Sequence, residues 1–150
     1  MTFKQAAEGT PGLSDAYRPG LQALSKADRN RIVCANPRRC TGSVDLDHAL
    51  AIPMPNEPRW DYGAGLRQDH SEKVVWIEVH PACSNHVDEV LAKLAWLKKW
   101  LHANAPLLNA LPRSFVWIAS GQVSLQRHSP QRRKVAARGL QFAGSRLSLA

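Results

Sequence analysis

The stretch KVVWIEVHP, residues 73 to 81, places two ionisable side chains in an otherwise apolar run. Its β-branched and aromatic residues predict a buried strand. Residues two apart on a strand share a face, so we expect Glu78 and His80 to point the same way, with Trp76 behind them. The residues between them would face the other way, into the helices: Val75, Ile77 and Val79. A carboxylate and an imidazole on one face could hold a metal ion or move a proton.

A second carboxylate, Asp61, lies on the preceding predicted strand, residues 59 to 66. The short polar link between the two strands predicts an antiparallel hairpin, which would bring Asp61 close to Glu78. Two neighbouring carboxylates repel each other unless a cation lies between them. Oxygen ligands suit Mg²⁺ or Mn²⁺, and such an ion can polarise a phosphoryl oxygen and activate water. The structural alternative is that Glu78 and His80 simply pair with neighbours in a half-exposed sheet.

Hydrophobic spacing, together with the residues that typically begin and end helices and strands, predicts the other elements. Helices are predicted at residues 19 to 33 and from Asn85, as its cap, to about His102. A second buried strand is predicted at residues 114 to 120. A short helix starts after Ser129 and ends at Gly139, and a strand closes the sequence. This order predicts an α/β fold with a mixed central β-sheet flanked by helices.

We expect residues 1 to 150 to form a single domain. Residues 1 to 18 are expected to be a loose N-terminal lead-in, because glycine and proline interrupt any pattern there. Two structures fit residues 43 to 50. In a strand, Asp45 and Asp47 would share a face and could add to the site, whereas in a short helix they would be capping and solvated charges.

The arrangement of Asp61 and Glu78 resembles the PD-(D/E)XK nuclease superfamily. There, an acidic residue on one strand is followed by Glu-X-Lys on the next, and a helix and a further strand follow. The resemblance extends in element order over roughly residues 20 to 145. It implies a restriction-endonuclease-like core that hydrolyses phosphodiester bonds in DNA or RNA. It also implies a Mg²⁺ or Mn²⁺ site at Asp61 and Glu78, with the backbone carbonyl of Val79 as a further ligand.

The sequence departs from the superfamily pattern at the lysine position, which holds His80. The superfamily's lysine positions or activates the attacking water, and a histidine could act as a base near neutral pH. Lys93, on the following helix, is the other candidate for this catalytic role, because lysine migration occurs in this superfamily. The alternative to an enzyme is a catalytically inactive module of the same fold that binds nucleic acid or protein.

Charge is distributed unevenly along the chain. Residues 90 to 150 carry ten Lys or Arg and no Asp or Glu, whereas residues 1 to 89 carry ten basic and twelve acidic residues. A segment of charge +10 beside one of −2 favours contact with a phosphate backbone, so nucleic acid is the expected partner. A solvated basic surface is the alternative. The candidate nucleic-acid-binding residues are Arg127, Arg132, Arg133, Lys134 and Arg138.

Zinc is the disfavoured cofactor. Cys83 and His86 have the spacing of a zinc-ligand pair, but the remaining cysteines and histidines do not complete the usual pattern of a zinc-stapled domain. Three cysteines do not suggest a disulfide framework. Trp96, Trp100 and Trp117 are expected in the core rather than as base-stacking platforms.

The sequence also limits the expected location. No apolar run approaches the ~18 to 20 residues needed to span a bilayer, so we expect no membrane partner. The first residues lack an apolar signal region, which favours a cytoplasmic protein.

Overall fold

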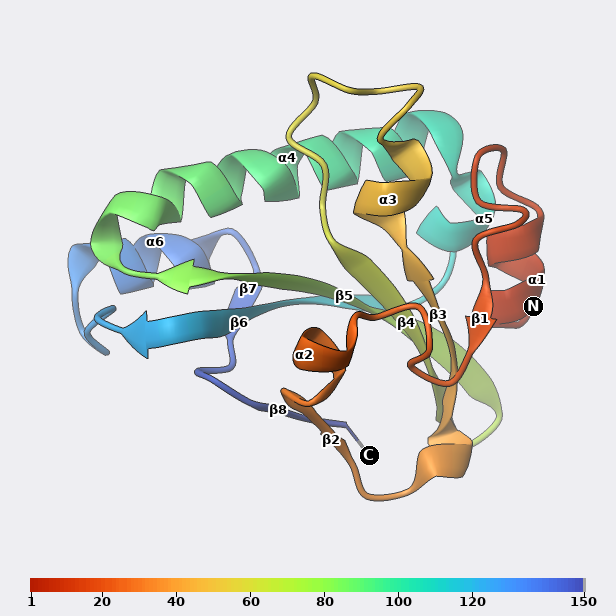
Figure 1. Ribbon diagram of the computed structural model, residues 1–150, viewed down its shortest axis with the longest axis horizontal. Helices are drawn as coiled ribbons and strands as arrows, with labels where there is room; N and C mark the ends of the chain where they lie inside the picture. Colours follow the sequence, from red (N-terminus) through yellow and green to blue (C-terminus); the bar gives the residue numbers. More distant parts are fainter. Residues whose placement is uncertain (150) are drawn as a thin grey trace.

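A mixed β-sheet forms the centre of the structure, a computed structural model that describes residues 1–149 (Figure 1). The strands of this six-stranded sheet follow the order β1-β3-β4-β5-β6-β7, and β2 and β8 form a separate two-stranded sheet. Helices flank the main sheet, as the sequence predicts. Along the chain the elements are α1 (Phe3–Glu8), β1 (Arg18–Pro19), α2 (Lys26–Arg29), β2 (Ile32–Cys34), the 3₁₀ turn η1 (Pro37–Arg39), β3 (Cys40–Asp45), α3 (Leu46–Leu50), β4 (Tyr62–Gln68), β5 (Ser71–Ala82), the 3₁₀ turn η2 (Ser84–His86), α4 (Val87–Asn104), α5 (Pro106–Asn109), β6 (Arg113–Val123), α6 (Pro130–Ala137), β7 (Leu140–Phe142) and β8 (Leu147–Leu149).

The strand directions divide the main sheet into two parts. The predicted hairpin is present, because β4 and β5 pair antiparallel from Tyr62 opposite Ile77 to Gln68 opposite Ser71. Strands β1, β3 and β4 are likewise antiparallel neighbours. Beyond β5 the pairing becomes parallel, with β6 and then β7. A parallel neighbour requires a crossover connection, which α4 provides between β5 and β6.

The two faces of the main sheet are covered by different elements. Helix α4 lies along one face and buries an apolar stripe against Trp76 and Trp117, while α2, β2 and β8 lie on the other side (Figure 1). There, Leu24, Leu147 and Leu149 pack with Ile77 and its neighbours. Glu78 shares the α4 face with Trp76. We expected Val75, Ile77 and Val79 to face the helices. This expectation is wrong for α4, because α4 covers the face of β5 that carries Trp76 and Glu78.

The first residues of the chain are part of the core and not a loose lead-in. Thr2 and Gln5 form a capping box, in which each side chain accepts a hydrogen bond from the other residue's backbone. Phe3 is completely buried, and its backbone N–H donates to Glu72 Oε1 at 3.0 Å. Helix α1 thus packs against β3 and β4 of the main sheet.

The helix predicted at residues 19 to 33 is also absent as a continuous element. Gly20 has a φ of 54° and starts a turn, and Ser25 caps the single-turn helix α2 by accepting from Asp28 N. The chain then extends into β2. Of the two leucines at helical spacing, Leu24 is buried beneath the sheet and Leu21 packs there partly buried, both without a long helix.

Two predicted helices are confirmed with small changes at their ends. Helix α4 runs from Val87 to Asn104, and its first residues follow the turn η2, in which Asn85 provides no side-chain cap. Helix α6 has Ser129 as its N-cap, and Gly139 follows it with a φ of 75°. Across residues 1–149, none of the helices combines the length and apolar character that a membrane span requires.

Candidate active site

Asp61 and Glu78 lie together at the start of β4. The register that pairs Tyr62 with Ile77 places Asp61 opposite Glu78. The backbone N–H of Asp61 donates to Glu78 Oε1 at 3.2 Å, and the N–H of Val79 donates to Asp61 Oδ2 at 3.0 Å. These reciprocal bonds fix both carboxylates. The predicted approach of the two acidic residues is therefore present in the structure.

Lys93 lies between the two carboxylates. It is on the second turn of α4, and its Nζ donates to Glu78 Oε2 and lies 3.7 Å from Asp61 Oδ1. Glu78 is completely buried, and the side chains of Asp61 and Lys93 are 21% and 16% exposed. Strand β5 carries no lysine beside Glu78. Because α4 covers the Glu78 face of the sheet, Lys93 on this helix reaches the carboxylates instead.

Burial and charge shift the protonation of this group. Burial and then the charge of Glu78 raise the pKa of Asp61 to about 7. Burial would lower the pKa of Lys93, but the charges of Glu78 and Asp61 outweigh it and raise the pKa. Lys93 is therefore a persistent ammonium, while Asp61 exchanges its proton near neutral pH.

The segment before β4 anchors Asp61 and settles the structure of residues 43 to 50. Residues 43 to 45 end strand β3 and residues 46 to 50 form α3, which Asp45 caps by accepting from His48 N at 2.9 Å. The N-terminus of α3 then donates from Leu46 N to the carbonyl of Asp61 at 2.8 Å. Asp47 accepts from Arg59 Nε at 3.0 Å and raises the pKa of Asp61 slightly further. Both aspartates thus support the position of Asp61.

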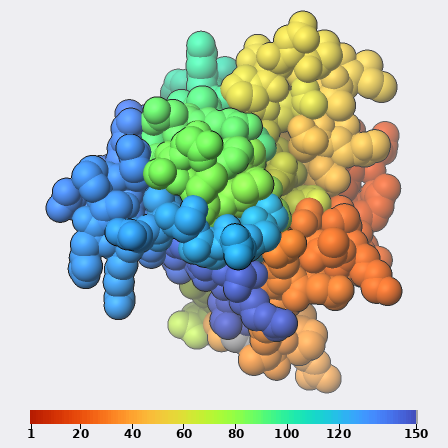
Figure 2. Space-filling model, turned by 60° about the vertical axis from the view of Figure 1, so that its left-hand side comes forward, coloured from red at the N-terminus to blue at the C-terminus, as the bar shows by residue number. Residues whose placement is uncertain are grey.

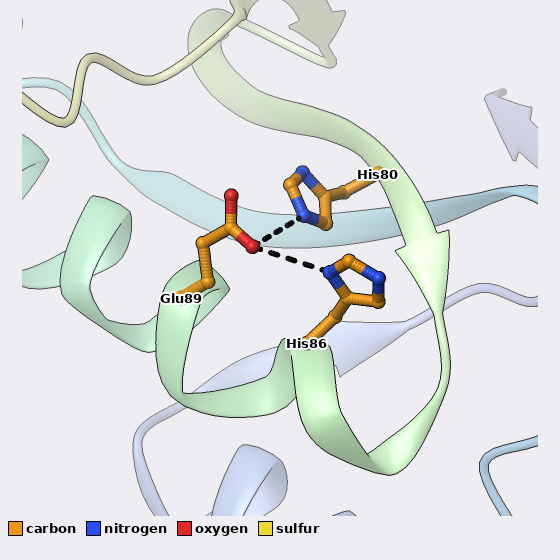
Figure 3. Close-up of side chains that lie close together, drawn as sticks. All are labelled: His80, His86 and Glu89. Atoms are coloured by element: carbon orange, nitrogen blue, oxygen red, sulfur yellow. Dashed lines mark hydrogen bonds and ion pairs between the residues drawn. The ribbon is translucent and has the colours of Figure 1, made fainter.

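His80 faces the same side of β5 as Glu78 but takes part in a different group. Its Nδ1 lies 3.4 Å from Glu78 Oε2, and its Nε2 lies 3.3 Å from Glu89 Oε2. His86 Nδ1 is 3.2 Å from the same oxygen of Glu89 (Figure 3). The hydrogen bond to Glu78 raises the pKa of His80 despite partial burial, and the hydrogen bond with His86 lowers the pKa of Glu89. Both ring nitrogens of His80 thus face carboxylates.

Glu89 belongs to this group but was not among the predicted site residues. The His86-X-X-Glu89 spacing, across the first turn after a strand ending in His80, is the signal that could have identified it, because residues three apart share a helix face.

The predicted phosphate-binding residues lie on and around α6, which contacts the first part of α4 (Figure 2). Two of them have partners in the structure. The Arg132 guanidinium stacks 4.6 Å from the Phe142 ring centroid, and Lys134 Nζ donates to Asp88 Oδ1 at 2.7 Å. The three others are exposed: Arg127, Arg133 and Arg138.

The cysteines and tryptophans take structural positions. Cys34 and Cys40 form a disulfide that joins β2 to the start of β3, although three cysteines did not suggest a disulfide framework, and Cys83 is free. The expectation that Trp96, Trp100 and Trp117 belong to the core is confirmed, since all three are buried.

Comparisons of the chain with protein-family models, with curated proteins and with solved structures found no match. The geometry of the site is therefore the basis for assigning a function.

Proposed function

We propose that the protein is a divalent-metal-dependent nuclease whose active centre consists of Asp61, Glu78 and Lys93. The observation that carries the proposal is the convergence of these side chains from three separate elements around a completely buried glutamate. Burying one carboxylate beside another is costly. A cation offsets this cost, and a functional site is where such an arrangement is most often found.

The order of elements around the site supports a PD-(D/E)XK-like assignment. An acidic residue directly precedes β4, Glu78 follows on β5, and then come α4 and β6. This is the order that the resemblance implies. Lys93 on α4 supplies the cation next to the carboxylates. His80, at the superfamily's lysine position, therefore does not have to supply a positive charge.

The two carboxylates fit a hard divalent ion. Lys93 Nζ contacts both, which means that a single cation can reach both side chains. Asp61 and Glu78 would hold Mg²⁺ or Mn²⁺. The backbone carbonyl of Val79 would be a further ligand, since N–H and C=O of one strand residue face the same neighbour and the N–H already donates to Asp61.

The chain's own groups then have distinct roles. When bound, the ion would polarise a phosphoryl oxygen and favour ionisation of a water molecule. Lys93, held as an ammonium, would stabilise the negative charge that develops on the phosphate and orient the attacking water. The cations of α6 would bind flanking phosphates of the nucleic acid.

Cleavage of DNA and RNA in the presence of Mg²⁺ or Mn²⁺ tests the proposal. We expect Asp61→Asn and Glu78→Gln each to lower the cleavage rate by roughly 100-fold or more, as removal of one transition-state contact does. Both variants should also weaken Mn²⁺ binding in a calorimetric titration. Glu8→Gln, which alters an exposed carboxylate on α1, is the control and should cleave like the wild type.

Two results would reject the enzyme. One is that wild-type protein binds nucleic acid but does not cleave it with either metal. The other is that Mn²⁺ binds all four proteins equally. Either result favours the non-catalytic binding module of the same fold.

A further inference from the structure

A second cluster of ligand-type side chains lies at the junction of β5 and α4. Among residues 1–149, His80, His86 and Glu89 offer one ligand atom each, and these atoms all lie within 4.8 Å of one another (Figure 3). They come from the end of β5, from η2 and from the first turn of α4. We propose that this cluster is a transition-metal site for an ion of the Zn²⁺ class, separate from the Asp61–Glu78 centre.

The distances in the cluster match the size of such an ion. Ligand atoms about 2.0 to 2.1 Å from a tetrahedral ion are about 3.3 to 3.4 Å apart. Glu89 Oε2 lies 3.3 Å from His80 Nε2 and 3.2 Å from His86 Nδ1. Two edges of the coordination polyhedron are therefore already in place.

His80 supplies a second, independent observation. Its Nε2 is buried, and within the described residues it has no well-aligned hydrogen-bond acceptor, its neighbouring carboxylate oxygen being Glu89 Oε2 at 3.3 Å. Glu89 Oε2 is near enough but is not aligned with the ring N–H direction. A metal ion lying between these side chains would supply the partner that this nitrogen lacks. A buried ring nitrogen without a partner is otherwise costly.

The other nitrogen of His80 has the partner that a metal-bound histidine usually has. Nδ1 lies 3.4 Å from Glu78 Oε2. A carboxylate in this position accepts the Nδ1 proton, which fixes the tautomer and leaves the Nε2 lone pair for a metal. Glu78 therefore orients His80 without being a ligand of this second ion.

The donor set selects the class of ion. Two imidazoles and one carboxylate suit Zn²⁺, Co²⁺ or Ni²⁺, whereas Mg²⁺ prefers oxygen ligands alone. The side chains of His86 and Glu89 are 32% and 57% exposed, so one side of the cluster is open to solvent. Three protein ligands and an open position are the arrangement of a zinc site that also binds water or substrate.

A Co²⁺ titration of the full chain, followed by visible absorption, tests the site. We expect one Co²⁺ per chain with the absorption of a nitrogen- and oxygen-ligated ion of low coordination number. His86→Ala and Glu89→Gln should each weaken this binding at least about tenfold. His70→Ala, which removes an exposed histidine elsewhere, should leave it unchanged.

Asp61→Asn separates this proposal from the nuclease. This variant should keep the Co²⁺ spectrum and affinity even though it loses Mg²⁺-dependent cleavage. If cleavage is absent in the wild type but the Co²⁺ site is present, the nuclease proposal fails alone. If Co²⁺ binds His86→Ala as tightly as the wild type, or binds neither, the metal-site proposal is overturned whatever the cleavage result.

Discussion

At the scale of single residues, Lys93 determines how a completely buried glutamate is tolerated. Its ammonium contacts Glu78 and approaches Asp61, and all three groups are largely shielded from water. Removing one partner of a buried ion pair leaves an uncompensated charge, which costs more than the pair contributes. The same side chain thus supports both the stability and the proposed catalysis.

Lys93→Met should therefore lower the free energy of unfolding by about 3 kcal/mol at pH 8. Denaturant unfolding in the presence of a chelator measures this change. Mg²⁺ should restore part of the loss, because a divalent ion would replace the missing positive charge. Lys99→Met, an exposed lysine on the same helix, is the control and should change stability by less than about 0.5 kcal/mol. Equal midpoints for Lys93→Met and the wild type would contradict the expectation.

Asp61 gives the metal-free protein a specific pH dependence. Its pKa is about 7 in the folded state but near 4 in the unfolded chain, so the folded state binds more protons between these values. The free energy of unfolding should fall as pH rises through this window. The asparagine of the Asp61→Asn variant does not titrate. The free energy of unfolding of this variant, relative to that of the wild type, should therefore increase by about 2 kcal/mol from pH 5 to pH 8. Chelator-treated samples at both pH values measure it, and a constant difference would contradict the prediction.

The candidate site was only partly predictable from single residues. Asp61 and Glu78 were identifiable because two strands and a short link fix their register. Lys93 was one of two candidates for the cation, and the choice depended on which face of β5 the helix covers. Strand periodicity places Glu78 on the same face of β5 as Trp76, but it does not predict which of the two faces of the strand packs against α4. The His86-X-X-Glu89 spacing is a sequence signal for Glu89, but its contact with His80 depends on the turn η2, which the sequence did not predict.

At the scale of elements, close approach explains why β4 contains glycine. A Cβ on Gly63 would lie 2.6 Å from the Trp76 ring, which is completely buried and has no room to move. A Cβ on Gly65 would meet Phe3 of α1 at a similar distance. Small residues in this strand let the neighbouring aromatic side chains lie across it.

Gly63→Ala should destabilise the protein by roughly 1 to 3 kcal/mol, the usual cost of overpacking. The control is a double-mutant cycle with Trp76→Leu, whose smaller side chain leaves space for the new methyl group. In that background the same alanine should cost clearly less. Thermal or denaturant unfolding of the four proteins measures the coupling, and strictly additive effects would show that the contact is not responsible.

Elements with strong local signals were predicted, and those that depend on distant contacts were not. Helix α4 has an uninterrupted apolar stripe, and α6 has Ser129, Pro130 and Gly139 at its ends, so both could be located from the sequence. The segment from 19 to 33 had helical spacing too, but Gly20 and the Ser25 cap divide it into turns. Helix α1 is only six residues long and is stable because Phe3 is buried by residues far along the chain.

At the scale of the whole molecule, the uneven distribution of charge along the sequence can be followed to its place in the structure. Helix α6 lies beside the first turn of α4, where Lys134 pairs with Asp88, and this end of α4 also carries Glu89 and Lys93 (Figure 1). A nucleic acid bound along α6 would therefore pass near the start of α4, the part of the helix on which Lys93 lies. Arg132 and Lys134 have intramolecular partners, so the other three arginines are the better candidates for phosphate contact.

Replacing Arg127, Arg133 and Arg138 together by alanine should weaken DNA binding and flatten its salt dependence. Each phosphate contact contributes roughly 0.9 to the slope of log K against log salt, so the slope should fall by roughly 2 to 3. Fluorescence anisotropy at several salt concentrations measures it. The matched control removes the same charge from Lys26, Arg29 and Arg38, which are also exposed. If both triple variants lose the same slope, binding depends on total charge and not on this surface.

The pairing of β2 with β8 also constrains how the protein is made. Ile32 pairs with Leu147, so β2 leaves the ribosome long before its partner exists. Until then, the side of the main sheet that carries Ile77 and Ile118 lacks the leucines that later cover it. Unfinished chains would therefore expose an apolar surface during synthesis, when aggregation competes with folding. Slow translation of the segment that contains β8, or the absence of chaperones, should thus affect the yield of this protein more than its stability once folded.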